Sequence, residues 1–246
     1  MMNSLSLPAV AGGEPIRTEF LVFGSPLIGE EEIAEVVDTM RSGWIGMGPK
    51  TARFEQEFAA YIGCPHAIAV NSATAALELA LIAAGVGPGD EVITSPMTFA
   101  ATANVVMHVG ARPIFADIAR ETQNIDPALL EAVVTARTRA IIPVHMAGRP
   151  CDMDALMAIA RRHKLVVIED AAHAVESKWR AQKIGAIADF TAFSFYVTKN
   201  LTTAEGGMLT TANAEWSDKL RILRLHGISK DAWKRYSTSE IGRAHV

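Results

Sequence analysis

One lysine, Lys199, lies just past an apolar run inside the stretch DFTAFSFYVTKNLTTAEGGMLTT, residues 189–211. Burying an ammonium group costs free energy unless the group is paired or acts as a neutral nucleophile. A neutral lysine amine can hold a carbonyl cofactor covalently as a Schiff base. The alternative is an ordinary solvated lysine in a surface loop, so the choice depends on which residues the fold brings beside Lys199.

Two consecutive acids, Glu169 and Asp170, close the apolar run that begins at Val166. Side chains alternate along a strand, so these two acids cannot face the same way. A buried Asp170 could stabilise a protonated pyridine nitrogen, which pyridoxal phosphate requires if its ring is to act as an electron sink. The alternative for Asp170 is a cap on the following turn. His173 could lie beside the same ring or could be a structural histidine.

Residues that could bind the rest of such a cofactor follow two other apolar runs and end the run that precedes Lys199. Thr74 and Ala75 open a helical segment, and free amides at a helix N-terminus suit a phosphate, although such residues are also ordinary helix caps. Ser194 ends the run that Lys199 follows, five positions before the lysine, and could donate its hydroxyl to the same phosphate. Phe99 could cover one face of the ring, although core packing is the usual role of phenylalanine. Together these positions predict a single pyridoxal phosphate site.

Seven short apolar runs carry these residues, and helical patterns alternate with them. This arrangement is typical of a mostly parallel sheet whose strands are buried on both faces by crossover helices. The runs cover residues 67–71, 91–95, 112–115, 140–144, 166–169, 189–194 and 207–211. The helical patterns cover residues 29–42, 51–62, 74–84, 99–109, 127–136, 153–163 and 214–225. Because ligands bind at the carboxyl ends of the strands in such a sheet, we expect the candidate residues to meet at one edge.

The composition argues against several other classes of function. The 246 residues carry a formal net charge of -4, unlike the strongly basic surface of a nucleic-acid-binding protein. Cys64 and Cys151 lie far apart without metal-binding spacing, so we predict no disulfide framework, no metal site and a reducing, cytoplasmic setting. The N-terminus lacks a signal-peptide pattern. The charge-free stretches 58–77 and 92–111 are interrupted by Pro, Gly, His or Asn, so no membrane span is predicted.

Five motifs together resemble the DegT-type (DegT/DnrJ/StrS) nucleotide-sugar aminotransferases, which are pyridoxal-phosphate enzymes of fold type I. The motifs are NSATAALELAL, GDEVITSPMTFAATANVV, IPVHMAGRPCDMDAL, VVIEDAAHA and FSFYVTKNLTTAEGG. The resemblance extends from Glu19 to Trp233. It implies an α/β fold with a three-layer α/β/α large domain around a mostly parallel seven-stranded sheet, and a C-terminal small domain that is missing.

The resemblance also divides the chain. Residues 1–28 are expected to form an N-terminal segment, and residues 29–226 the pyridoxal-phosphate-binding large domain. Residues 227–239 would begin a truncated C-terminal region. The last seven residues, EIGRAHV at 240–246, look like translated sequencing-adapter read-through, so we interpret them as a scar, with a natural origin as the alternative.

By the same resemblance, Lys199 is the catalytic residue that holds the cofactor covalently. Asp170 pairs with the pyridine nitrogen, Phe99 stacks on the ring, and His173 lies beside the cofactor. The phosphate ligands are Thr74, Ala75 and Ser194.

The implied reaction transfers an amino group from L-glutamate to a nucleotide-diphosphate-linked keto sugar. The segment LHGISKDAW, residues 225–233, favours a UDP-linked 4-keto sugar. Such amino sugars serve surface polysaccharide, lipid A modification or secondary metabolites. The resemblance further implies a homodimer with shared active sites.

Three positions depart from the family pattern. Gly46 and Met47 stand where small hydroxyl residues are frequent, and Ala204 stands where glycine is common. These departures concern sugar recognition more than chemistry. Two alternatives stay open. A dehydratase of the same family carries histidine at the lysine position, which Lys199 disfavours. A non-catalytic binding protein on the same fold would keep the cavity without turnover.

Overall fold

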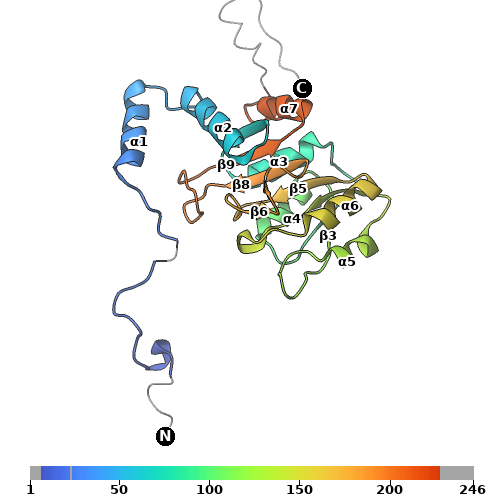
Figure 1. The fold of residues 1–246 in the computed structure, drawn as a ribbon, viewed down its shortest axis with the longest axis horizontal. Coiled ribbons are helices and arrows are strands. Elements are labelled where there is room, and N and C mark those ends of the chain that lie inside the picture. Colours follow the sequence, from blue (N-terminus) through green and yellow to red (C-terminus); the bar gives the residue numbers. More distant parts are fainter. Residues whose placement is uncertain (1–6, 23, 228–246) are drawn as a thin grey trace, which may run out of the picture.

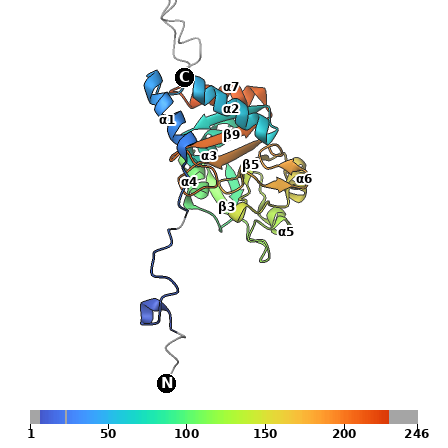
Figure 2. The same cartoon turned by 60° about the vertical axis from the view of Figure 1, so that its left-hand side comes forward.

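The structure, a computed structural model, describes residues 7–22 and 24–227 of the chain. Figure 1 shows helices packed around one sheet, with the N-terminal segment extending away as an irregular tail that holds a short 3-10 helix, η2 (Ala9–Ala11). Figure 2 shows the same separation from another side. The predicted scar at 240–246, and the predicted C-terminal region beyond its first residue, lie outside the described residues. Within the described part of the chain, no helix is long and apolar enough to cross a membrane.

The central sheet has seven strands in the order β1-β9-β8-β5-β4-β2-β3. They are β1 (His66–Val70), β2 (Glu91–Thr94), β3 (Arg112–Phe115), β4 (Thr138–Ile142), β5 (Val166–Asp170), β8 (Phe190–Ser194) and β9 (Gly207–Thr211). β9 is antiparallel to both of its neighbours, and the other adjacent pairs are parallel. The short elements outside this sheet are β6 (Lys178–Trp179), β7 (Gln182–Lys183) and η4 (Met146–Gly148). The seven predicted runs are the seven strands, so the mostly parallel sheet is confirmed.

Helices cover both faces of the sheet. One face carries α3 (Ala73–Ala83), α4 (Ala100–His108) and α7 (Ala214–Leu223). The other face carries α2 (Pro49–Ile62), α5 (Pro127–Leu130) and α6 (Met153–His163). Successive strand residues point to opposite faces, so Val92 of β2 belongs to the first core and its neighbour Ile93 to the second. The three-layer α/β/α arrangement predicted from the sequence is therefore confirmed.

The helix predicted over residues 127–136 is shorter than expected. It consists of α5 followed by a 3-10 turn, η3 (Glu131–Val133), and Val134 is extended. The Thr135 hydroxyl donates to the buried carboxylate of Glu91 on β2 at 2.5 Å. This contact ties Thr135 to the sheet. Hydrogen bonds from threonine side chains offer the chain an alternative to continued helix.

The first long helix, α1 (Glu30–Ser42), forms as its spacing predicts, but its apolar face is open. Among its described side chains none is buried, and Ile33 and Met40 are 46% and 65% exposed. The capping of the helix is local: the Gly29 amide donates to Glu32 at 2.7 Å. The amphipathic pattern therefore predicted the helix correctly but not where its apolar face lies.

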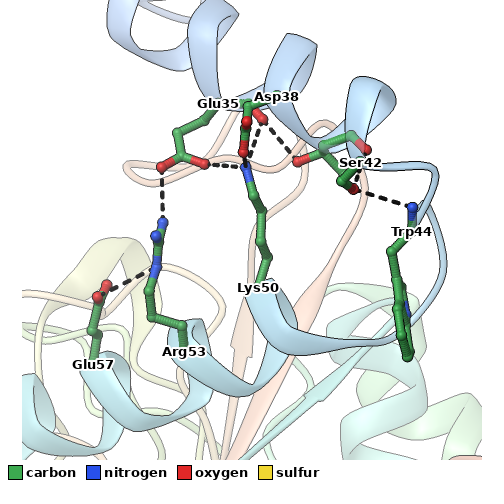
Figure 3. Close-up of polar contacts among 8 residues, drawn as sticks. Glu35, Asp38, Ser42, Trp44, Lys50, Arg53 and Glu57 are labelled. Carbon is green, nitrogen blue, oxygen red and sulfur yellow. Dashed lines mark hydrogen bonds and ion pairs between the residues drawn. The ribbon is translucent and has the colours of Figure 1, made fainter.

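Ion pairs attach α1 to α2, as Figure 3 shows. The Lys50 ammonium of α2 lies 2.5 Å from the Glu35 carboxylate and 2.7 Å from that of Asp38. Arg53 lies 2.9 Å from the other oxygen of Glu35. Hydrogen bonds from Lys50 and Arg53 lower the pKa of Glu35 to about 2. Exposed ion pairs add little stability individually, so this attachment is weaker than the packing of the helices on the sheet.

Candidate active site

A cavity of about 670 Å³ lies at the carboxyl edge of the sheet, where β4, β5 and β8 end and α3 and α4 begin. Because β9 is antiparallel, its first residues reach the same edge. Six of the seven predicted site residues line this cavity: Thr74, Phe99, Asp170, His173, Ser194 and Lys199. The rule that ligands bind beyond the carboxyl ends of strands therefore located the cavity.

The seventh residue, Ala75, is placed differently. Among the described residues that line the cavity, Ala75 does not occur. Its backbone amide donates to the hydroxyl of Ser72, the N-cap of α3, at 3.1 Å. The alternative of ordinary helix capping thus describes this amide, and Ser72, which lines the cavity, is the capping residue.

Hydroxyl groups and the start of α3 form one end of the cavity. Thr74 is half-buried in the first turn of α3, and Ser194 is buried at the end of β8. Gly207 allows the start of β9 to lie against the start of α3, because a Cβ atom there would lie 2.5 Å from the carbonyl carbon of Ser72. Two hydroxyls beside the positive end of a helix dipole suit a phosphate group.

Asp170 is buried on another wall, with both carboxylate oxygens hydrogen-bonded. The Thr102 hydroxyl on α4 donates to Oδ2 at 2.7 Å, and the Ala172 amide donates to Oδ1 at 3.2 Å. The backbone of Asp170 is paired as well: its amide donates to the Pro143 carbonyl at 2.8 Å, and its carbonyl accepts from the His145 amide at 3.1 Å. The predicted turn cap is thus present, and the carboxylate that forms it also lines the cavity.

Glu169 faces away from Asp170, as strand alternation requires. Its carboxylate accepts from the Thr191 hydroxyl and lies 3.2 Å from Nε2 of His145, with both side chains fully buried. The amide of Cys151 donates to Nδ1 of His145 at 3.1 Å, so Nδ1 is an acceptor and the ring proton lies on Nε2. Burial, with the charge of Glu169 second, raises the pKa of the Cys151 thiol. This buried cluster therefore holds His145 in place, and the backbone amide of His145 donates to the carbonyl of Asp170.

Lys199 and His173 lie near each other at the opening. Burial lowers the pKa of the Lys199 amine, and the charge of Asp170 opposes this effect in part. Partial burial also lowers the pKa of His173, and the charge of Lys199 lowers it further. Both shifts favour the neutral bases, and a neutral amine is the form that attacks a carbonyl group.

The segment after Lys199 explains one departure from the family pattern. Ala204 has a φ angle of 66°, in the left-handed region that favours glycine. Two residues later, a Cβ atom on Gly206 would lie 2.2 Å from Oγ1 of Thr203. Ala204 thus occupies a position where glycine would be unstrained, whereas the close contact at Gly206 admits no side chain without a shift.

The groups around the cavity fit pyridoxal phosphate. The Lys199 amine suits the aldehyde carbon, Asp170 suits the ring nitrogen, and Thr74 and Ser194 suit the phosphate. The volume of about 670 Å³ is within the usual range for a cofactor site. Two supporting residues, Thr102 and His145, were missed from the sequence. Thr102 follows Phe99 within a predicted helix, and His145 follows an apolar run, which is the signal that could have identified it.

A lysine and a carboxylate line one cavity at the carboxyl edge of this sheet, an arrangement that suits a lysine-bound cofactor. The chain belongs to the DegT/DnrJ/EryC1/StrS aminotransferase family, whose model matches residues 26–245. The predictions of family, α/β fold class and pyridoxal phosphate cofactor are thereby confirmed.

Several known proteins are similar to this chain. The spore coat polysaccharide biosynthesis protein SpsC of Bacillus subtilis is 60% identical over 223 residues, which is 91% of this chain and 57% of SpsC. Spr1654 from Streptococcus pneumoniae in its PLP form superposes with a TM-score of 0.82 at 44% identity, covering 84% of this chain and 58% of that one. DesI, solved in the presence of its TDP-sugar product, superposes with a TM-score of 0.85 at 37% identity, covering 93% of this chain and 58% of that one. The chain thus spans less than two thirds of these relatives.

Proposed function

We propose that the protein transfers an amino group from L-glutamate to a nucleotide-diphosphate-linked keto sugar, with pyridoxal phosphate held on Lys199. The observation that carries this proposal is the cavity itself, because it joins Lys199, Asp170 and the start of α3. Lys199 also separates the proposal from the dehydratase alternative, in which histidine stands at this position.

The cavity residues would divide the binding of the cofactor and the transfer of the proton among them. Bound in the cavity, the cofactor would supply an electron sink for breaking bonds at the amino carbon. Asp170 holds the ring nitrogen through its fixed carboxylate, and Thr74 and Ser194 bind the phosphate. The Lys199 amine would hold the cofactor and, once released, would carry a proton between a carbon of the cofactor and a carbon of the substrate. Fixing the ring and the phosphate removes the entropy of orientation from that transfer.

The remaining cofactor contacts come from Phe99, which covers the ring, and His173, which lies beside it. Phe99 is 80% exposed, so its ring is free to face a ligand in the cavity. Ala75 would act indirectly at the phosphate end, because its amide donates to Ser72, which lines the cavity.

The sugar nucleotide is supported by the relatives. DesI was solved with a TDP-sugar product, and SpsC is named for polysaccharide biosynthesis. We therefore infer an amino sugar for surface polysaccharide as the product, with lipid A modification and secondary metabolites as the other uses of such sugars. The preference for a UDP-linked sugar rests on residues 225–233, of which 228–233 lie outside the described residues.

We further infer a cytoplasmic homodimer with shared active sites. Two aromatic side chains at the cavity support this inference, since Phe99 and Tyr196 are 80% and 45% exposed. Exposed aromatic groups around a site are typical of surfaces that a second chain covers. Measurement of the molar mass in solution tests the dimer, and a monomer that retains full activity would contradict it.

The proposed reaction can be tested by spectroscopy on the protein encoded by the complete reading frame. Loaded with pyridoxal phosphate, the protein should show the absorption band of the bound cofactor. Adding L-glutamate should convert it to the pyridoxamine form and release 2-oxoglutarate in equal amount. A spectrum that L-glutamate leaves unchanged would support the non-catalytic binding protein instead.

A further inference from the structure

Two threonine hydroxyls connect the cavity to Asp170. Thr102 on α4 is fully buried, and its hydroxyl lies 2.7 Å from Oδ2 of Asp170. The hydroxyl of Thr98 lies 2.6 Å from that of Thr102, and Thr98 lines the cavity. The three side chains therefore form a continuous chain of hydrogen bonds from the cavity wall to the carboxylate.

The proton positions in this chain follow from counting donors. A hydroxyl has one proton to donate, and a carboxylate has none. Thr102 donates its proton to Asp170, so Thr98 must be the donor to Thr102. The Ala172 amide can only donate, so Oδ1 of Asp170 is also an acceptor. Both carboxylate oxygens are thus held by donors, which fixes the plane of the carboxylate.

The buried hydroxyl of Thr102 is used in an unusual way for a helix. Threonine within a helix commonly donates to a backbone carbonyl one turn earlier. Here the hydroxyl bonds to two side chains, while the Thr102 amide donates to the Phe99 carbonyl at 3.1 Å. One turn of chain, residues 98–102, therefore carries both the proposed ring cover and the group that holds the proposed partner of the ring nitrogen.

We propose that Thr102 is a positioning residue that holds the Asp170 carboxylate in place and aimed at the cofactor's ring nitrogen, with Thr98 reinforcing it in series. This inference rests on the proposed function. Hydrogen bonds in a chain polarise one another, so Thr98 strengthens the donor that Thr102 presents to Asp170. Thr102 does not touch the cofactor itself in this account, because its hydroxyl is spent on Asp170.

The test uses the protein from the complete reading frame and cofactor labelled with 15N in the pyridine ring. Thr102→Val keeps the shape of the side chain and removes the hydroxyl, and Thr102→Ser restores the hydroxyl. We expect Thr102→Val to weaken binding of pyridoxal phosphate about tenfold, the scale of one lost hydrogen bond to a charged group. The 15N signal should shift toward that of an unprotonated pyridine. Thr102→Ser should return both readouts to near the wild-type values.

Thr210 provides a matched control, since it is a buried threonine on β9 whose hydroxyl donates to the Gly185 carbonyl at 2.9 Å. Thr210→Val should lower the melting temperature and leave the 15N signal in place. If Thr102→Val gave the wild-type affinity and 15N signal, or if Thr210→Val reproduced its effects, Thr102 would be merely structural. Failure of the wild-type protein to bind the cofactor would instead overturn the proposed function.

The serial arrangement has its own test, which also serves if Thr102→Val fails to fold. Thr98→Val should shift the 15N signal in the same direction by a smaller amount, with about a threefold loss of affinity. The double variant should be no worse than Thr102→Val, because groups acting in series are not additive. Additive losses, or a Thr98→Val protein with the wild-type signal, would show that Thr98 does not act through Thr102.

Discussion

The acid wall of the cavity and its lysine loop are held in opposite ways. We define the acid wall as Thr102, Asp170 and Ala172, and the lysine loop as residues 196–206. Asp170 ends a central strand, and hydrogen bonds fix both its backbone and its carboxylate. The lysine loop is bonded mostly within itself: the Lys199 amide donates to the Tyr196 carbonyl at 2.9 Å, and the Thr203 hydroxyl donates to the Glu205 carbonyl at 2.8 Å. One exposed side chain, Asn200, donates outside the loop to Glu176 at 3.1 Å.

This difference matches the two tasks. A carboxylate that stabilises a charge must stay in place, so a strand and a neighbouring helix hold it. An amine that holds the cofactor and then carries a proton must change position, which a half-exposed loop permits.

Replacing the lysine should have the largest effect. Lys199→Ala should abolish covalent attachment of pyridoxal phosphate and reduce turnover to background, because it removes the attacking amine. Borohydride reduction followed by peptide mass mapping should place the cofactor on Lys199 in the wild-type protein and nowhere in the variant. Lys178→Ala is the matched control and should be labelled normally. A cofactor found on Lys178 or Lys183 would refute the assignment.

Replacing the acid should separate attachment from turnover. Asp170→Asn should still bind the cofactor covalently but lose turnover by about a hundredfold or more, the scale of losing a preorganised charge at a reacting centre. The amide keeps the shape but cannot stabilise a protonated ring nitrogen as a carboxylate does. Single-turnover rates with L-glutamate measure the loss. Near-normal rates would make Asp170 a purely structural residue.

The acid wall and the lysine loop should also be coupled electrostatically. Burial lowers the pKa of Lys199 below the usual 10.5, so in the cofactor-free protein its amine should be acetylated at lower pH than the side chain of free Nα-acetyl-lysine. The charge of Asp170 raises that pKa, so in Asp170→Asn the midpoint of the reactivity curve should move to still lower pH. Competitive labelling with mass spectrometry gives both curves. A midpoint that moves upward in the variant would contradict the coupling.

Relaxing the lysine loop should have the smallest effect. Ala204→Gly relieves a left-handed alanine but adds freedom to the unfolded chain, so the free energy of unfolding should rise by about 0.5 kcal/mol. In the exposed helical control Ala60→Gly, it should fall by about 1 kcal/mol. Urea unfolding measures both. A large loss of cofactor affinity in Ala204→Gly would show that the loop is less independent of the acid wall than the contrast implies.

The same contrast explains what could be predicted from the sequence. Strands buried on both faces give continuous apolar runs, and the residues after those runs meet at one edge, so Asp170, Ser194 and Lys199 could be located together. Thr102 could not be found, because nothing local distinguishes a buried helical threonine that bonds to a residue 68 positions away. The early end of α5 was also not predictable, since the chain beyond it bonds across the sequence, from Thr135 to Glu91. The exposure of the apolar face of α1 could not be predicted either, because the spacing of apolar residues indicates an apolar stripe but not the surface that covers it.

The central claim is that the acid wall and the lysine loop hold one cofactor between them. A crystal structure of the complete reading frame's product with pyridoxal phosphate tests this most directly. We predict continuous density from the Lys199 amine to the cofactor, and a pyridine nitrogen about 2.7 Å from a carboxylate oxygen of Asp170, the length of a charge-assisted hydrogen bond. Density joined to another lysine, or a ring nitrogen pointing away from Asp170, would contradict the account.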